Sequence, residues 1–255
     1  MGRVNAQHAV LLGLAGFAAG VVNAIAGGGS LISFPALLFT GMPPVAANAT
    51  NTVAIWPGTV SSTWAYRRLI SEEKHRAWVL AWPSLIGGLA GSILLLHTPE
   101  SAFRAVVPWL ILFAAGLLAA QGPVARWVSR AMSSASSRVP PALWLAQLAI
   151  SIYGGYFGAG IGILMLAAMA IFLPDTLQHA NALKVLFSLL INGIAALYFL
   201  VAGSVHLPEA ALMMVAAVVG GWAGAHLAQR LPAWLMRLLV IAFALVVAGR
   251  LLWKA

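Results

Sequence analysis

Long apolar segments constrain this chain more than any other feature of its sequence. Eight can be drawn, at residues 8–40, 45–66, 77–97, 104–121, 142–173, 179–203, 208–228 and 234–253. A helix needs about 20 apolar residues to cross a bilayer. Only 7% of the 255 residues are charged, whereas a soluble domain carries about 25%. The sequence therefore predicts an all-α polytopic membrane protein.

The first and fifth segments are longer than the others, and glycines interrupt each of them, at 26–30 and 158–162. A gapless shift of 133 residues superimposes the two regions. It places Gly27 on Gly160, Gly29 on Gly162, Asn48 on Asn181, Asn51 on Lys184 and Thr59 on Asn192. We therefore expect two pseudo-symmetric four-segment repeats, at 1–121 and 142–255, with a cytoplasmic linker at 122–141. The first helix of each repeat is expected to be broken by its glycines.

The distribution of Lys and Arg predicts the orientation of the chain. With eight crossings, ten bases share the side of the linker and three lie on the other side. The positive-inside rule then places both termini and the linker in the cytoplasm. An alternative stays open, in which each broken segment is a re-entrant hairpin and the repeats are inverted. The first segment also resembles a signal peptide, but its apolar pattern continues past Ala24, so we expect it to be retained.

The two glycine interruptions are the first candidate for a functional site. Non-helical backbone at membrane depth is tolerated only inside protein or beside a water-filled cavity. A helix that restarts there, at Ser30 or Ile163, directs free N–H groups and a partial positive charge at the gap, which suits an anion. The alternative interpretation is that these glycines only allow helices to pack closely.

Polar side chains at helical spacing are the second candidate. Asn181, Lys184, Ser188 and Asn192 share one face of the sixth segment, and a similar stripe begins with Asn48 and Asn51 in the second. A lysine within the bilayer is costly, so Lys184 is interpreted as a fixed charge for an anionic substrate. The alternatives are hydrogen bonding between helices, pairing of Lys184 with Asp175, or snorkelling of Lys184 to the interface.

Several classes of function are excluded by what the sequence lacks. The chain has no cysteine, which excludes thiol catalysis, and no Walker motif or metal-ligand spacing. Its net charge of +9 comes from bases between apolar runs, not from a nucleic-acid-binding stripe. We therefore expect no cofactor, no metal and no nucleic-acid partner.

Two motifs resemble a known family. Residues 20–30 read GVVNAIAGGGS and residues 47–52 read ANATNT, which resembles the first half of the TauE/SafE (TSUP) family of sulfite-exporter-like permeases. Residues 154–162 and the ANALK sequence at 180–184 resemble the second half, although Ala159 and Ile161 interrupt that glycine run. The resemblance covers nearly the whole chain. It implies an inner-membrane permease for sulfur-containing oxyanions such as sulfite or sulfonates.

Together these observations predict a secondary transporter, and not an enzyme, that exports a small sulfur-containing oxyanion by alternating access. The expected partners are a small anionic substrate and the lipid bilayer, and a homo-oligomer is left open. We expect the substrate between the two glycine interruptions. The predicted binding residues are Asn23, Gly28, Gly29, Ser30, Asn48, Asn51, Gly160, Gly162, Asn181, Lys184 and Asn192. The alternatives are a permease for another small anion, such as a carboxylate, or a non-transporting intramembrane enzyme or scaffold.

Overall fold

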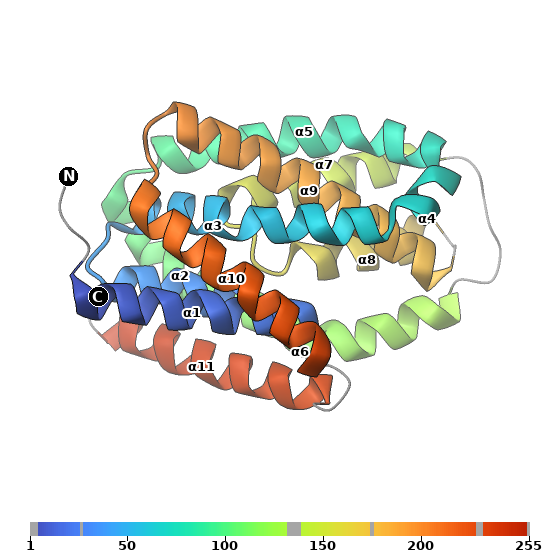
Figure 1. Cartoon of the computed structure of the whole chain (residues 1–255). Helices are drawn as coiled ribbons and strands as arrows, with labels where there is room; N and C mark the ends of the chain where they lie inside the picture. The colour runs from blue at the N-terminus through green and yellow to red at the C-terminus, as the bar shows by residue number, and fades with distance from the viewer. Residues whose placement is uncertain (1–4, 26–27, 132–138, 174–175, 228–231, 254–255) are drawn as a thin grey trace. The chain divides into compact units, whose positions relative to one another are not determined.

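The computed structural model describes residues 5–25, 28–131, 139–173, 176–227 and 232–253, and these contain helices and no strand (Figure 1). The helices are α1 (Ala6–Ile25), α2 (Ser30–Phe39), α3 (Pro44–Ala65), α4 (Arg67–Glu72), α5 (Lys74–His97), α6 (Glu100–Ala131), α7 (Pro141–Tyr156), α8 (Ile161–Phe172), α9 (Leu177–Val201), α10 (Leu207–Leu227) and α11 (Ala233–Trp253).

The helices occupy all eight predicted apolar segments. Within the described residues, six helices are long and apolar enough to cross a membrane: α1, α5, α6, α9, α10 and α11. The shorter apolar helices are α2 and α8. This confirms the prediction of an all-helical chain with several membrane spans, while the arrangement of eight segments in two repeats stays a prediction.

The two overlong segments are broken where their glycines lie. The first break lies between Ile25 of α1 and Ser30 of α2, where the structure describes Gly28 and Gly29. The second break, residues 157–160, separates α7 from α8. Gly28, Gly158 and Gly160 have φ angles of 88°, 81° and 82°. This left-handed region costs little for glycine but is unfavourable for residues with a Cβ atom. The glycines therefore permit backbone turns that other residues would resist.

The chain forms two compact units that do not follow the order of the sequence. Unit 1 contains Met1–Gly58, Leu96–Ala119 and Phe199–Ala255, and unit 2 contains Thr59–Leu95 and Ala120–Tyr198. The chain thus passes from one unit to the other within α3, α5, α6 and α9.

The segment predicted as the linker, residues 122–141, begins inside a helix. Helix α6 continues to Ala131, so it includes the first part of the 122–141 segment, and residues 132–138 lie outside the described residues. Gly122 and Pro123 suggested a helix end in the sequence. Both residue types are more frequent in membrane helices than in soluble ones, and the helix passes through them here.

Close packing of α1 on α10 organises unit 1 (Figure 1). A Cβ atom on Gly20 would collide with the carbonyl oxygen of Ala217, and one on Gly220 would collide with that of Phe17. Small residues allow helix backbones to approach in this way where the membrane provides no hydrophobic driving force. Close packing is therefore the role of these glycines outside the breaks.

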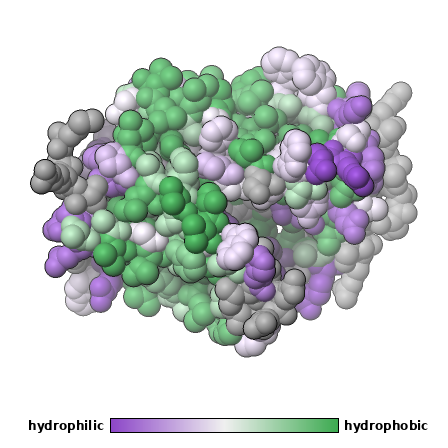
Figure 2. Space-filling view, viewed as in Figure 1, coloured by the Kyte–Doolittle hydropathy of each residue, from purple (hydrophilic) through white to green (hydrophobic). Residues whose placement is uncertain are grey.

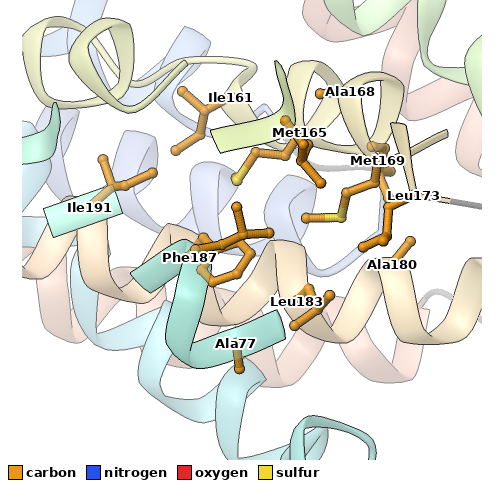
Figure 3. Close-up of a cluster of buried hydrophobic side chains, with 13 residues drawn as sticks. Ala77, Ile161, Met165, Ala168, Met169, Leu173, Ala180, Leu183, Phe187 and Ile191 are labelled. Carbon is orange, nitrogen blue, oxygen red and sulfur yellow. The ribbon is translucent and has the colours of Figure 1, made fainter. Parts of the chain in front are cut away.

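Unit 2 contains an equally close helix pair, α5 and α7. A Cβ atom on Gly155 would collide with the carbonyl oxygen of Gly88. Beside this pair, α8 and α9 share an apolar cluster that includes Met165, Met169 and Phe187 (Figure 3). This cluster holds α8, and thus the end of the second break, against α9.

The outer surface of the helices is largely apolar. Figure 2 shows hydrophobic residues over much of the visible face. Large apolar side chains such as Trp64, Trp78 and Val201 are exposed. A soluble protein would not expose so many, whereas lipid solvates them.

Candidate functional site

The predicted binding residues fall into two groups, one in each unit, and each group is described by itself. Unit 1 contains Asn23, Gly28, Gly29, Ser30, Asn48 and Asn51, and unit 2 contains Gly160, Gly162, Asn181, Lys184 and Asn192.

In unit 1, a side chain of α1 spans the first break. The N–H group of Gly29 donates to Oδ1 of Asn23 over 2.8 Å, and a Cβ atom on Gly29 would lie 2.8 Å from the Asn23 amide. The N–H group of Gly29, a predicted binding residue, is thus engaged within the protein. Asn23 itself is exposed at the end of α1.

The polar stripe of α3 is buried and tied to α2. Asn48 and Asn51 are 1% and 2% exposed. The hydroxyl of Ser33 lies 2.5 Å from Oδ1 of Asn51 and 3.2 Å from the carbonyl oxygen of Gly29. For Asn51, this supports the alternative interpretation of hydrogen bonding between helices. Sequence reasoning missed Ser33, although it follows Ser30 by three residues and so shares its helix face.

Gly28 and Ser30 complete the unit 1 group. A Cβ atom on Gly28 would lie 3.1 Å from Cδ2 of Leu118 in α6, and its positive φ also disfavours a larger residue. Ser30 is the first residue of α2 and is half-buried. This group therefore consists of a tight turn stabilised by Asn23 and a buried amide stripe.

In unit 2, Tyr153 fixes the second break. Its hydroxyl donates to the carbonyl oxygen of Ala159 over 2.7 Å. Its own carbonyl oxygen accepts from the N–H groups of Phe157 at 2.9 Å and Gly158 at 3.2 Å. Nothing in the spacing of the sequence singles out Tyr153, because the contact depends on the loop conformation.

Lys184 of α9 lies against the first turn of α8. Its Cδ atom is 3.1 Å from the position that a Cβ atom would occupy on Gly162. Its Nζ atom donates to Oδ1 of Asn181 over 2.8 Å, and Nδ2 of Asn181 donates to the carbonyl oxygen of Leu177 over 2.9 Å. The second bond fixes which way the Asn181 amide points. The predicted pairing with Asp175 lies outside the described residues.

Asn192 lies beside the other end of the second break. Its Oδ1 atom is 3.6 Å from the position of a Cβ atom on Gly158, and its Nδ2 atom donates to the carbonyl oxygen of Ser188 over 2.8 Å. Gly160 is the N-cap residue of α8. In unit 2, Lys184 thus lies against Gly162 and Asn192 lies beside Gly158, whereas Asn181 contacts Lys184 and Leu177 within α9.

This arrangement favours an anion. The N-terminus of α8 carries a partial positive charge, and Lys184 adds a cationic side chain alongside it. Asn181 and Asn192 supply amides, which can both donate and accept. No group of three His, Asp or Glu side chains arranged to hold a metal ion occurs in the part of the chain that the structure describes.

Comparison with known proteins gives a consistent result. Residues 12–251 match the family model described as Sulfite exporter TauE/SafE. The chain is 29% identical over 241 residues to a "Probable membrane transporter protein" of Haemophilus influenzae, covering 93% of this chain and 92% of that protein. It is 28% identical over 244 residues to "Probable membrane transporter protein ORF9" of a Sinorhizobium species, covering 94% and 90%.

A third relative is "Probable membrane transporter protein YfcA" of Escherichia coli strain K12. The two sequences are 26% identical over 251 residues, which cover 96% of this chain and 91% of that protein. No solved structure matches the chain.

Proposed function

Because the chain belongs to the Sulfite exporter TauE/SafE family, we propose that it exports a small sulfur-containing oxyanion, such as sulfite or an organosulfonate, by alternating access. Its family and its relatives support a multi-pass membrane transporter and not an enzyme. The substrate class, the direction of transport, the inner-membrane location and the cytoplasmic termini are part of the proposal.

The observation that carries the proposal is the position of Lys184 beside Gly162. A positively charged side chain in a membrane-spanning helix is costly and is usually functional. Here it lies at the N-terminus of another helix, where the backbone also favours negative charge. Two independent sources of positive potential therefore meet at one place in unit 2.

The proposed binding roles follow from this geometry. Lys184 supplies the charge, and Asn181 and Asn192 supply side-chain amides. Gly160 permits the left-handed turn before α8, and Gly162 leaves room for the stem of Lys184. An oxyanion has several acceptor atoms and so benefits from several donors at once. A carboxylate has two acceptor oxygens, whereas a sulfonate has three. A carboxylate is therefore the anion against which the preference for sulfur oxyanions is tested.

The unit 1 residues have a more structural part in the proposal. Asn23, Gly28 and Gly29 keep the first break in its turned conformation. Ser30, Asn48 and Asn51 stay proposed substrate contacts, with the Asn51 carbonyl already accepting from Ser33.

Binding to the purified protein tests the proposal. Sulfite, methanesulfonate, thiosulfate and acetate are titrated against wild type, Lys184→Met and Lys184→Arg, with Lys74→Met as the matched control because Lys74 is exposed at the start of α5. Losing a hydrogen bond to a charged group costs about 1.5–3 kcal/mol, and about 1.4 kcal/mol is one decade. Lys184→Met should therefore weaken sulfur-oxyanion binding at least about tenfold.

Lys184→Arg should keep part of the affinity, although a guanidinium fork differs from an ammonium. Lys74→Met should bind like wild type, and efflux of the bound anion from proteoliposomes should follow the binding order. Equal affinity in wild type and Lys184→Met, with unchanged thermal stability, would remove Lys184 from the site. Tighter binding of acetate than of every sulfur oxyanion would replace the proposed substrate class.

A further inference from the structure

A histidine in unit 2 faces a carboxylate at each of its two ring nitrogens. In His179, at the start of α9, Nε2 is 3.2 Å from Oε2 of Glu72 and Nδ1 is 3.5 Å from Oε1 of Glu73. Glu72 ends α4, and Glu73 lies between α4 and α5. The side chains of His179 and Glu73 are 24% and 12% exposed. Sequence reasoning singled out none of these residues.

The geometry selects the protonated form of the ring. An ionised carboxylate only accepts hydrogen bonds, and a neutral imidazole carries a single N–H group. Both contacts are hydrogen bonds only when both nitrogens carry hydrogen, as in the imidazolium. In the neutral ring, one lone pair would face a carboxylate oxygen. Histidine is also the side chain whose charge ordinarily changes between about pH 5 and 8.

The surrounding charges also favour the bound proton. Nη1 of Arg76 donates to Oε2 of Glu73 over 2.8 Å, and Arg76 is buried. Glu72 and Glu73 present negative charge to the two ring nitrogens of His179. A charged histidine therefore pairs with both carboxylates, of which Glu73 is mostly buried and Glu72 is exposed.

The cluster lies on the same helix as the proposed anion site. Asn181 and Lys184 follow His179 by two and five residues in α9. The first turn of α9 is therefore held against the α4–α5 turn by two ring contacts, of which the neutral imidazole can make only one as a hydrogen bond. Loss of these contacts would release the first turns of α9, which carry the hydrogen-bonded pair Asn181 and Lys184.

We propose that His179, held between Glu72 and Glu73, is a proton-binding site, and that the bound proton raises anion affinity at Lys184 by fixing the start of α9. The first half of this inference stands by itself, and the second half rests on the proposed function. The stabilisation is present when His179 is charged and is lost as the pH rises and the ring becomes neutral.

Thermal unfolding without ligand tests the proton site. Wild type and His179→Gln are compared at roughly pH 5.5 and 8.5, on either side of the range in which histidine changes charge. The thermal midpoint of wild type should exceed that of the variant by a larger margin at the lower pH, and the margin should grow by roughly 2–4 °C. Glu72→Gln, which removes one of the two facing charges, should reduce this difference. His226→Gln is the matched control, because His226 is exposed and contacts the carbonyl oxygen of Trp222 in its own helix.

Methanesulfonate binding tests the link to the anion site, because the charge of this probe is constant over that pH range. The affinity of wild type for methanesulfonate should fall at least about fivefold from the lower to the higher pH. About fivefold is the lower end of the usual range for coupling between two sites. His179→Gln should show a smaller change, and His226→Gln the wild-type change.

The outcomes separate the two proposals. An advantage of wild type over His179→Gln that is equal at both pH values overturns the proton site. A pH-dependent stability difference with the same pH dependence of affinity in wild type and His179→Gln overturns the coupling. Absence of methanesulfonate, sulfite and thiosulfate binding at either pH overturns the proposed function, and unfolding still decides the proton site.

Discussion

The aliphatic stem of Lys184 covers Gly162, with Cδ 3.1 Å, Cγ 3.6 Å and Cε 3.8 Å from the position of a Cβ atom on the glycine. The absence of a side chain at 162 therefore allows the lysine to lie along the first turn of α8. The same distances imply that a methyl group at 162 would press on the lysine stem, which would have to move by a few tenths of an ångström.

Gly162→Ala should separate affinity from stability. Alanine is favoured over glycine in a helix by up to about 1 kcal/mol, so the thermal midpoint should stay level or rise. Anion affinity should fall about threefold or more, since about 1.4 kcal/mol is one decade and the shifted lysine loses part of its interaction. Gly116→Ala is the control, because a Cβ atom there meets nothing within 4 Å. An unchanged anion affinity in Gly162→Ala would mean that the position of the lysine stem does not matter for binding.

Gly160→Ala should destabilise the second break. Gly160 has a φ of 82°, and the left-handed conformation costs about 1–2 kcal/mol for a residue with a Cβ atom. The thermal midpoint in detergent should therefore fall. Gly13→Ala, in the open interior of α1, should instead leave it level or raise it. Equal midpoints for the two variants would show that this loop relaxes without cost.

Ser33→Ala should destabilise the contact between α2 and α3. Removal of the hydroxyl leaves Oδ1 of Asn51 without this donor in a site where Asn51 is 2% exposed. An unsatisfied buried polar group costs about 1–3 kcal/mol, which urea or thermal unfolding resolves. Ser101→Ala, at an exposed position near the start of α6, should change stability by no more than about 0.5 kcal/mol. A loss no larger in Ser33→Ala than in Ser101→Ala would contradict the assigned hydrogen bond.

Cysteine labelling should place residues 67–76 in the cytoplasm. The chain has no cysteine, so Ser71→Cys and Ser101→Cys each give a single reactive thiol at an exposed position. The positive-inside rule predicts that a membrane-impermeant reagent added to intact cells labels Ser101→Cys and spares Ser71→Cys. The reverse pattern would invert the proposed topology.

The sequence was sufficient to predict features that depend on local chemistry. Glycine runs placed the two breaks correctly, because backbone at positive φ selects for glycine. Helical spacing placed Lys184 three residues from Asn181, and the structure joins them by a hydrogen bond. That contact lies within one helix, so periodicity alone could indicate it.

Features that depend on distant contacts could not be predicted. Gly20 and Gly220 gave no sign of being close, because small residues occur on most of the helices and do not specify a partner. Tyr153 and His179 were missed for the same reason, since a loop conformation and a neighbouring turn provide their partners. Gly122 and Pro123 lie inside α6, so these residue types alone do not mark the end of a membrane helix.

The pairing of α1 with α10 has a consequence for how the chain is synthesised. Leu207, at the start of α10, follows Ile25, at the end of α1, by 182 positions, whereas Pro141 of α7 follows His97 of α5 by 44. At roughly 5–20 residues per second, the ribosome needs roughly 9–36 s to supply the partner of α1 and roughly 2–9 s to supply that of α5. Helix α1 thus leaves the ribosome well before α10, and its glycines wait longer for their packing partner than those of α5 do.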